Sequence, residues 1–114
     1  MTTYNFGDVL LVPFPFTNQT ATKKRPTIVI SSDSYNQSKL DILLIAVTSQ
    51  VKTPLQFGEA LITEWSKAGL LKPSVIKPII TTLEKKLVIK KLGKLETTDI
   101  RALQSLLQQI IAIA

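Results

Sequence analysis

Arg25 and Pro26 are the first residues whose types and spacing suit chemistry on a phosphate. Proline fixes its own φ and biases the residue before it toward an extended conformation, so we expect Arg25 at the start of a strand that continues through Ile28 to Ile30. A guanidinium held in this way is a planar, permanently charged set of N–H donors, which suits recognition of a phosphate. An ordinary surface arginine beside a proline is the alternative, because short patterns often match by chance.

A second polar group, Thr48-Ser49-Gln50, directly follows the apolar stretch Asp41–Val47. If this stretch pairs antiparallel with the strand that begins at Arg25, both polar groups lie at the same rim of the sheet, and consecutive strands are commonly neighbours. Hydroxyl and amide donors would then meet the guanidinium around one pocket and stabilise charge that develops on a phosphorane. The alternative is that these residues only begin a polar loop.

The chain contains neither histidine nor cysteine, which excludes several kinds of chemistry. Without histidine there is no Ser-His-Asp triad and no side chain whose ordinary pKa lies near neutral pH. Without cysteine there is no disulfide, no thiolate nucleophile and no cysteine-bound metal. We therefore expect no metal and no cofactor, and an enzyme with this composition must use carboxylates, lysine, arginine, tyrosine or hydroxyls.

The length of 114 residues and the 45% hydrophobic content predict one domain with a sizeable core, spanning residues 1–114. Fourteen basic against eight acidic residues give a net charge of +6, and nine of the basic residues lie in 61–114. This balance favours polyanionic partners, or an acidic protein that masks the same surface. No apolar run approaches the length of a membrane span and no stretch resembles a signal peptide, so we expect a soluble cytoplasmic protein.

Several short strands and one clear helix are expected to position these groups. The predicted strands cover 7–14, a stretch from Arg25, 41–47, 74–82 and a segment ending near Gly93, with a weaker candidate at 55–62; the predicted loops are 16–24 and 33–39. Helical turns are expected at 64–69, with Thr63 as N-cap and Gly69 after the last turn. This pattern indicates a mainly β protein with α (α+β), a small, partly open barrel with a helix packed on it.

The C-terminal helix has apolar residues at three- and four-residue steps from Ile100 to Ile111, with Thr97 or Thr98 as its cap and Asp99 in its first turn. Its last residues, 110–114, are apolar almost all round. We expect this end to be buried against the sheet or against a second subunit. The single tryptophan, Trp65, is expected in the core.

Five pieces of sequence, in this order, resemble the MazF/PemK toxins of type II bacterial toxin–antitoxin systems. They are Gly7-Asp8-Val9 with Val12-Pro13-Phe14-Pro15-Phe16-Thr17; Lys24-Arg25-Pro26 with Ile28-Val29-Ile30-Ser31; Ala46-Val47-Thr48-Ser49-Gln50; Trp65 with Ala68-Gly69-Leu70-Leu71-Lys72-Pro73-Ser74-Val75-Ile76; and Lys91-Leu92-Gly93-Lys94-Leu95. The last two match a PemK-like subgroup, and the resemblance covers about residues 6–110.

The resemblance implies an SH3-like barrel of the CcdB and PemK type that forms a homodimer. It implies a metal-independent, ribosome-independent endoribonuclease that cuts single-stranded RNA at specific sequences and leaves a 2′,3′-cyclic phosphate and a 5′-hydroxyl. It also implies a cognate antitoxin whose acidic, disordered tail lies across the active site, with DNA binding by the pair. The family's catalytic arginine falls on Arg25, which would stabilise or protonate the leaving 5′-oxygen, and its catalytic threonine falls on Thr48, which would donate to the phosphorane.

The resemblance also implies residues that bind the substrate. They are Phe16, Thr17, Lys23, Lys24, Ser49, Gln50 and Lys77. Lys77 stands where some members carry an arginine, and because lysine lacks the bidentate fork we expect it to anchor a phosphate. The stretch 79–82 lacks the acidic or glutamine residue that several relatives carry, and Asp8 and Glu59 are the nearest carboxylates that could replace it as a base.

Two other functions fit the same barrel. Gyrase-poisoning toxins share it and act by binding a protein, although such a poison needs neither Arg25 nor Thr48. A non-catalytic nucleic-acid-binding or regulatory module is the other alternative, and it would be favoured if Arg25 were buried in a structural ion pair.

Aromatic side chains near the first loop, Phe14 and Phe16, are the better candidates for stacking on RNA bases.

Overall fold

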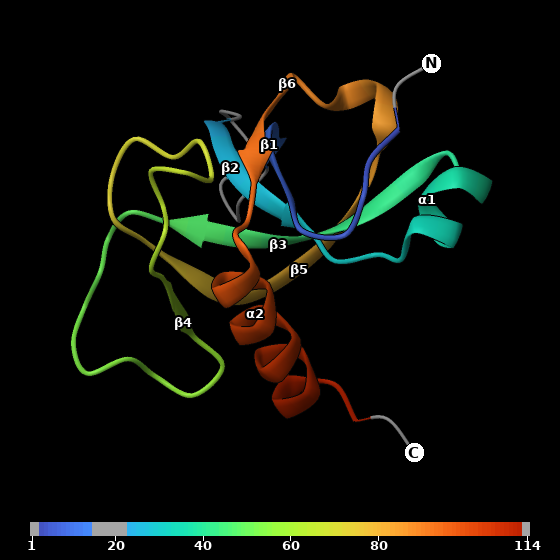
Figure 1. The fold of residues 1–114 in the computed structure, drawn as a ribbon. Helices are drawn as coiled ribbons and strands as arrows, with labels where there is room; N and C mark the ends of the chain where they lie inside the picture. The colour runs from blue at the N-terminus through green and yellow to red at the C-terminus, as the bar shows by residue number, and fades with distance from the viewer. Residues whose placement is uncertain (1–2, 15–22, 113–114) are drawn as a thin grey trace.

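The computed structural model describes residues 3–14 and 23–112, which form a curved antiparallel sheet with a C-terminal helix (Figure 1). The strands are β1 (Asp8–Phe14), β2 (Lys23–Val29), β3 (Asp41–Thr48), β4 (Ala60–Ile62), β5 (Ser74–Glu84) and β6 (Lys90–Lys94). The helices are α1 (Asp33–Ser38), the short 3-10 helix η1 (Lys85–Leu87) and α2 (Thr97–Ile110). None of the helices in this described part of the chain is long and apolar enough to cross a membrane.

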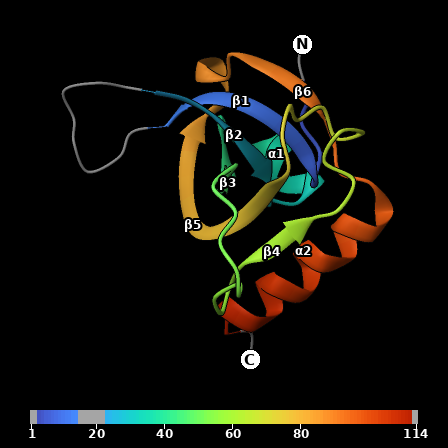
Figure 2. The same ribbon diagram turned by 90° about the vertical axis from the view of Figure 1, so that its left-hand side faces the viewer.

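The six strands form one sheet in the order β4-β5-β3-β2-β1-β6, and every neighbouring pair is antiparallel. The sheet curls around its own interior, and α2 lies beside β4 across the open side (Figure 2). Since β4 and β6 are the two ends of the sheet, the barrel stays partly open. The prediction of a mainly β, partly open barrel with a C-terminal helix is confirmed.

The core consists of two clusters of buried side chains. In the first, residues of the sheet such as Val9, Ile28 and Ile45 pack with Leu103 and Leu106 from α2. The apolar spacing of the helix thus places its buried face on the sheet. The second cluster gathers around β1 and β3 and includes the N-terminal Tyr4. Trp65 is partly buried against the first cluster, which confirms its expected place in the core.

The predicted pairing of β2 with β3 is confirmed, with Thr27 opposite Ala46 and Ile28 opposite Ile45. The start of β2 was predicted two residues too late, because Lys23 and Lys24 already pair with β1. Basic residues with exposed side chains are compatible with a strand whose end lies at the rim of a sheet. The residues that precede Lys23, from 15 to 22, lie outside the described part.

The predicted loop at 33–39 is wrong, since residues 33–38 form α1. The Ser32 side chain accepts a hydrogen bond from the backbone N–H of Tyr35 and so caps the helix, and Asn36 is buried where its side chain donates to the carbonyls of Tyr4 and Ser31. A stretch of small polar residues can form either a turn or a capped helix. Here the hydrogen bonds that the Asn36 side chain donates to Tyr4 and Ser31 favour the helix.

The turns at 63–69 form as predicted, with Gly69 at a positive φ of 90°. Their cap differs from the prediction. The buried carboxylate of Asp99 accepts hydrogen bonds from the backbone N–H of Thr63 and of Glu64, both at 2.9 Å, and from the Thr63 hydroxyl at 2.8 Å. Asp99 in the first turn of α2 therefore fixes the segment that leads into Leu70.

Two boundaries were predicted wrongly. The weak strand at 55–62 is reduced to the three residues of β4, and α2 has Glu96 as its N-cap, without a side-chain capping bond, in place of Thr97 or Thr98. At the end of α2, Ile110 is partly buried, while Ile111 is 42% exposed. Burial of the apolar end against this chain's own sheet is therefore only partial.

Candidate functional site

Arg25 and Thr48 are brought together at the rim where β2 begins and β3 ends. The β2–β3 ladder ends at the pair of Thr27 with Ala46, and Arg25 and Thr48 each lie two residues beyond that pair, at the same rim of the sheet. On its other side Arg25 pairs with Val12 of β1. Thr48 in turn pairs with Val75 of β5, so strand pairing rather than a loop fixes the backbone positions of both residues.

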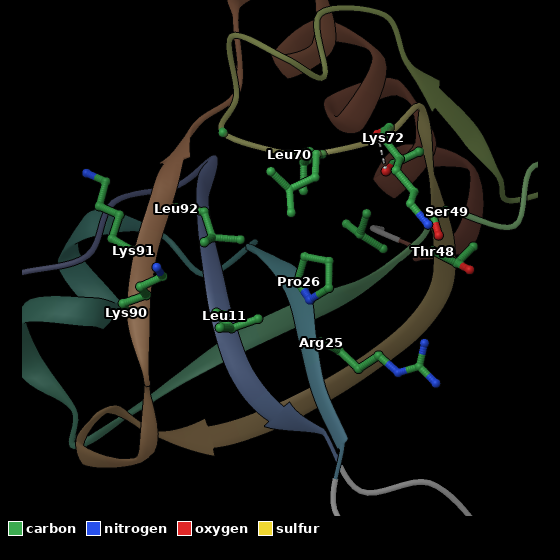
Figure 3. A pocket seen from close by; sticks show the side chains of 14 residues that line it. Leu11, Arg25, Pro26, Thr48, Ser49, Leu70, Lys72, Lys90, Lys91 and Leu92 are labelled. Carbon is green, nitrogen blue, oxygen red and sulfur yellow. Dashed lines mark hydrogen bonds between the residues drawn. The ribbon is translucent and has the colours of Figure 1, made fainter.

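Both side chains line a cavity of about 580 Å³. Its apolar lining includes Leu11, Pro26, Leu70 and Leu92, and Ser49 lies at its rim beside Thr48. Figure 3 shows Arg25, Thr48 and Lys72 along one side of this cavity, and Lys90 and Lys91 along the other. The cavity therefore has an apolar lining between Arg25 and Lys72 on one side and Lys90 on the other, while the Lys91 ammonium is paired with Asp8. Such a site favours a ligand that carries both apolar surface and negative charge.

One wall of the cavity depends on two glycines that lie back to back. A Cβ on Gly69 would lie 2.1 Å from the carbonyl oxygen of Leu92, and one on Gly93 would lie 2.3 Å from the carbonyl oxygen of Ala68. The segment after Trp65 therefore approaches β6 backbone to backbone, which no other residue type allows. This contact holds Leu70 and Lys72 against the cavity.

The hydroxyl of Thr48 has a defined orientation. Its Oγ1 accepts a hydrogen bond of 3.1 Å from the backbone N–H of Gln50. A hydroxyl oxygen that accepts in this way keeps its own proton for donation to another partner. Thr48 is thus prepared to donate toward the cavity, which is the role expected of a residue that stabilises a phosphate oxygen.

Thr48 also lines a second, smaller cavity of about 160 Å³. Its other lining residues are Gln50, Lys52, Pro54, Gln56, Glu59, Val75 and Lys77. Lys77 and Glu59 form an ion pair here, with 2.7 Å between Nζ and Oε2. The bond from Lys77, together with a 2.9 Å hydrogen bond from the backbone N–H of Gln56 to Oε1, lowers the pKa of Glu59 below its ordinary value.

Neither carboxylate that could serve as a base stands open in the large cavity. Asp8 is fully buried at the start of β1, where it accepts a hydrogen bond from the Asn5 N–H and lies 3.3 Å from Nζ of Lys91. Glu59 has both oxygens engaged by Lys77 and Gln56. In residues 3–14 and 23–112 no three acidic side chains gather into a group that could hold a metal ion.

The predicted residues fall into three groups. Arg25, Thr48 and Ser49 line the large cavity, and Gln50 and Lys77 join Thr48 in the small one. Lys23 and Lys24 precede Arg25 on β2 with exposed side chains but line neither cavity. Phe16 and Thr17 lie outside the described residues, and so does the side chain of Phe14.

Sequence reasoning missed the cations Lys72, Lys90 and Lys91 of the large cavity. A signal for them was present, since Gly69 and Gly93 each stand close to these lysines in the sequence and paired glycines indicate close backbone contact. The contact of Lys77 with Glu59 was also missed. It depends on the register of the three-residue strand β4, which the sequence did not define.

The fold agrees with solved structures of MazF proteins. MazF from Deinococcus radiodurans has a TM-score of 0.73 at 16% identity, with 94% of each chain covered. An endoribonuclease from a mycobacterial species, solved with its cognate antitoxin, has a TM-score of 0.71 at 16% identity, with 94% of this chain and 91% of that chain covered. The Mycobacterium tuberculosis toxin MazF-mt6 has a TM-score of 0.66 at 16% identity, with 85% and 90% covered.

Comparison with curated protein sequences found no match. The sequence matches one family model over residues 5–111, and that model describes a PemK-like, MazF-like toxin of a type II toxin–antitoxin system. The match includes both strands that meet at Arg25 and Thr48 and the two glycines that shape the cavity wall. The chain therefore belongs to the PemK-like and MazF-like toxins of type II toxin–antitoxin systems.

Proposed function

We propose that this toxin is a cytoplasmic endoribonuclease that cuts single-stranded RNA at a phosphate held between Arg25 and Thr48. The observation that carries this proposal is the convergence of a guanidinium and an oriented hydroxyl on one cavity, from adjacent strands, in a member of this toxin family. The similar solved chains that bear the name endoribonuclease support the same activity.

In the proposed reaction the 2′-oxygen of the ribose forms a bond to phosphorus, and the bond between phosphorus and the 5′-oxygen breaks. The products are a 2′,3′-cyclic phosphate and a 5′-hydroxyl. Arg25 stabilises the charge on the phosphorane and on the leaving oxygen, and the Thr48 hydroxyl donates to a non-bridging oxygen. Because a guanidinium keeps its proton near neutral pH, water takes the 2′-hydroxyl proton and supplies one to the 5′-oxygen.

This reaction requires no metal ion, since the negative charge is stabilised by a guanidinium and a hydroxyl. RNA fragments should therefore appear in the presence of EDTA. Primer extension on a long mixed RNA in EDTA would map the cuts made by the wild type, by Arg25→Ala and by Thr48→Val. We expect cuts at one short recurring sequence, and losses of about 100-fold or more in Arg25→Ala and about tenfold or more in Thr48→Val.

Thermal unfolding of both variants serves as the control for folding. A folded wild type that makes no cuts would contradict the nuclease and favour the gyrase-directed or non-catalytic function. Cuts that survive in both variants would support the nuclease activity but would contradict the assignment of Arg25 and Thr48 as its catalytic residues. Arg25→Lys separates charge from geometry, because lysine keeps the charge and loses the bidentate fork; we expect it to recover only part of the rate.

The partner that we propose is a cognate antitoxin whose acidic segment covers the large cavity. Similar structures contain an antitoxin, which is MazE in two complexes from Deinococcus radiodurans. The cations at the cavity suit acidic residues, and Leu71, which lines the same cavity and is 93% exposed, offers apolar contact at its edge. A segment bound there would block access to Arg25 and Thr48. We also expect the toxin to form a homodimer.

A further inference from the structure

The small cavity beside Thr48 has the dimensions of a site for one planar ring rather than for a length of chain. Its neighbour, the large cavity, shares Thr48 with it, so a strand of RNA whose phosphate lies at Thr48 passes both. The small cavity is bounded by β3, by β5 and by the segment 50–59. It is therefore a separate site that adjoins the proposed point of cleavage.

The strands fix Lys77 close to Thr48. Val75 lies directly opposite Thr48 in the β3–β5 ladder, and Lys77 is two residues further along the same face of β5. The β3–β5 register shifts between Ile45 and Val47, so Lys77 lies where this part of the ladder ends, and Thr48 and Lys77 both line the small cavity. Lys77 therefore lies within reach of a nucleotide whose phosphate contacts Thr48.

Glu59 holds the Lys77 ammonium in place. The register Ala60 with Ile76, continued by one residue, sets Glu59 opposite Lys77, and their side chains meet at 2.7 Å. The Glu59 side chain is only 10% exposed, whereas that of Lys77 is 39% exposed. An ammonium has three N–H donors, and the pair with Glu59 uses one. The remaining donors of Lys77 are available toward the cavity.

The ion pair favours a nucleobase over a phosphate. A phosphate bound to Lys77 would lie beside the Glu59 carboxylate, and like charges at such distances repel each other. A base is neutral, so it can accept hydrogen bonds from the ammonium without this repulsion. The lining also contains the Lys52 ammonium and the amide groups of Gln50 and Gln56, which makes the cavity rich in donors.

We propose that this cavity binds one nucleobase next to the scissile phosphate and that Lys77, held by Glu59, selects bases with a carbonyl oxygen on the reading edge. Uracil and guanine present such acceptors, whereas the corresponding positions of cytosine and adenine carry amino donors. The inference rests on the proposed function, since it names a specificity position of the same RNA site. It changes the expected role of Lys77 from phosphate anchor to base reader.

The test compares Lys77→Met with the wild type in the primer-extension map. We expect one position of the cut sequence to lose its preference for U or G over C and A by about tenfold, the size of one base contact, while the other positions keep theirs. The base that the wild type prefers at this position of the cut sequence shows whether the cavity binds uracil or guanine. Lys86→Met is the matched control, because Lys86 forms an exposed pair with Glu84 at 3.7 Å, at the far end of β5.

A binding measurement separates this inference from the cleavage reaction. Hexamers of 2′-O-methyl cytidine, with a single U, G or A stepped through the six positions, cannot react through a 2′-hydroxyl. Fluorescence anisotropy should give tighter binding with U or G at one position for the wild type and Lys86→Met, and equal binding in Lys77→Met. We expect this difference in affinity even if the wild type cuts no RNA. That combination of results would contradict the proposed nuclease activity and still support the inferred base-binding site.

Two outcomes would overturn the inference. Equal weakening of all hexamers in Lys77→Met, with a salt dependence whose log–log slope falls by about 0.7, would identify Lys77 as a phosphate contact. Unchanged cut sequence and unchanged hexamer affinities would identify the pair with Glu59 as purely structural. Glu59→Gln provides a second variant, and it should relax the base preference without removing the lysine.

Discussion

Single residues in this site differ in how far their roles follow from their own chemistry. Arg25 and Thr48 combine residue types that suit phosphate chemistry with positions on paired strands, and the sequence predicted both features. The role of Lys77 depends on a partner 18 residues away in the chain. A lone lysine on β5 would be a cation for a phosphate, whereas the Glu59 carboxylate holds the Lys77 ammonium in position and balances its charge.

The Glu59–Lys77 pair makes the stability of the protein depend on pH. The folded pKa of Glu59 is lowered, chiefly by the bond from Lys77, so the pair stabilises the fold above the ordinary glutamate pKa of about 4.5, and this contribution disappears as the pH falls through the lowered value. We therefore expect Glu59→Gln to lower the melting temperature at pH 7, and we expect this difference from the wild type to shrink as the pH falls below the ordinary glutamate pKa. Calorimetry over a series of pH values tests this, and a difference that stays constant down to acid pH would contradict it.

At the scale of the element, the wall of the large cavity depends on the contact between the 63–69 turns and β6. Gly93→Ala would place a Cβ 2.3 Å from the Ala68 carbonyl oxygen, so the turns must move away. We expect a loss of about 1–3 kcal/mol in the free energy of unfolding. Trp65, the only tryptophan, lies in the moving segment, so its emission should shift to longer wavelength in the folded variant. Unchanged emission and stability would refute the close contact.

Elements with strong periodicity were predictable, and elements held by distant partners were not. The strands β1, β3 and β5 and the helix α2 follow from their own apolar patterns. By contrast, α1 depends on the hydrogen bonds of Asn36 to Tyr4 and Ser31, and the cap of the 63–69 turns comes from Asp99. The large cavity was therefore predicted at Arg25 and Thr48 but not at Lys72, Lys90 and Lys91, which the glycine contact brings in.

At the scale of the whole molecule, apolar surface gathers where the end of α2 meets β5. A Cβ on Gly58 would lie 3.3 Å from side-chain atoms of both Ile110 and Pro78, so these residues surround one point. Gly58, Pro78 and Ile110 each stand next to an exposed apolar residue in the sequence. These neighbours are Phe57, which is 77% exposed, Ile79, which is 45% exposed, and Ile111, which is 42% exposed. Exposed apolar side chains that flank such a contact in the sequence are candidates for an interface. A second copy of the chain is the partner that we expect there.

We predict that the toxin is a dimer at micromolar concentration and that Phe57→Lys together with Ile111→Lys makes it a monomer, because each buried apolar contact is replaced by a charge in the interface. Light scattering coupled to gel filtration measures the mass. Leu40→Lys is the matched control. Leu40 is 84% exposed, and its carbonyl accepts a hydrogen bond from the backbone N–H of Lys85, directly after the C-terminal end of β5, so this variant should remain a dimer. A monomeric wild type would exclude the homodimer, and a dimer that survives the double variant would place the interface on another face.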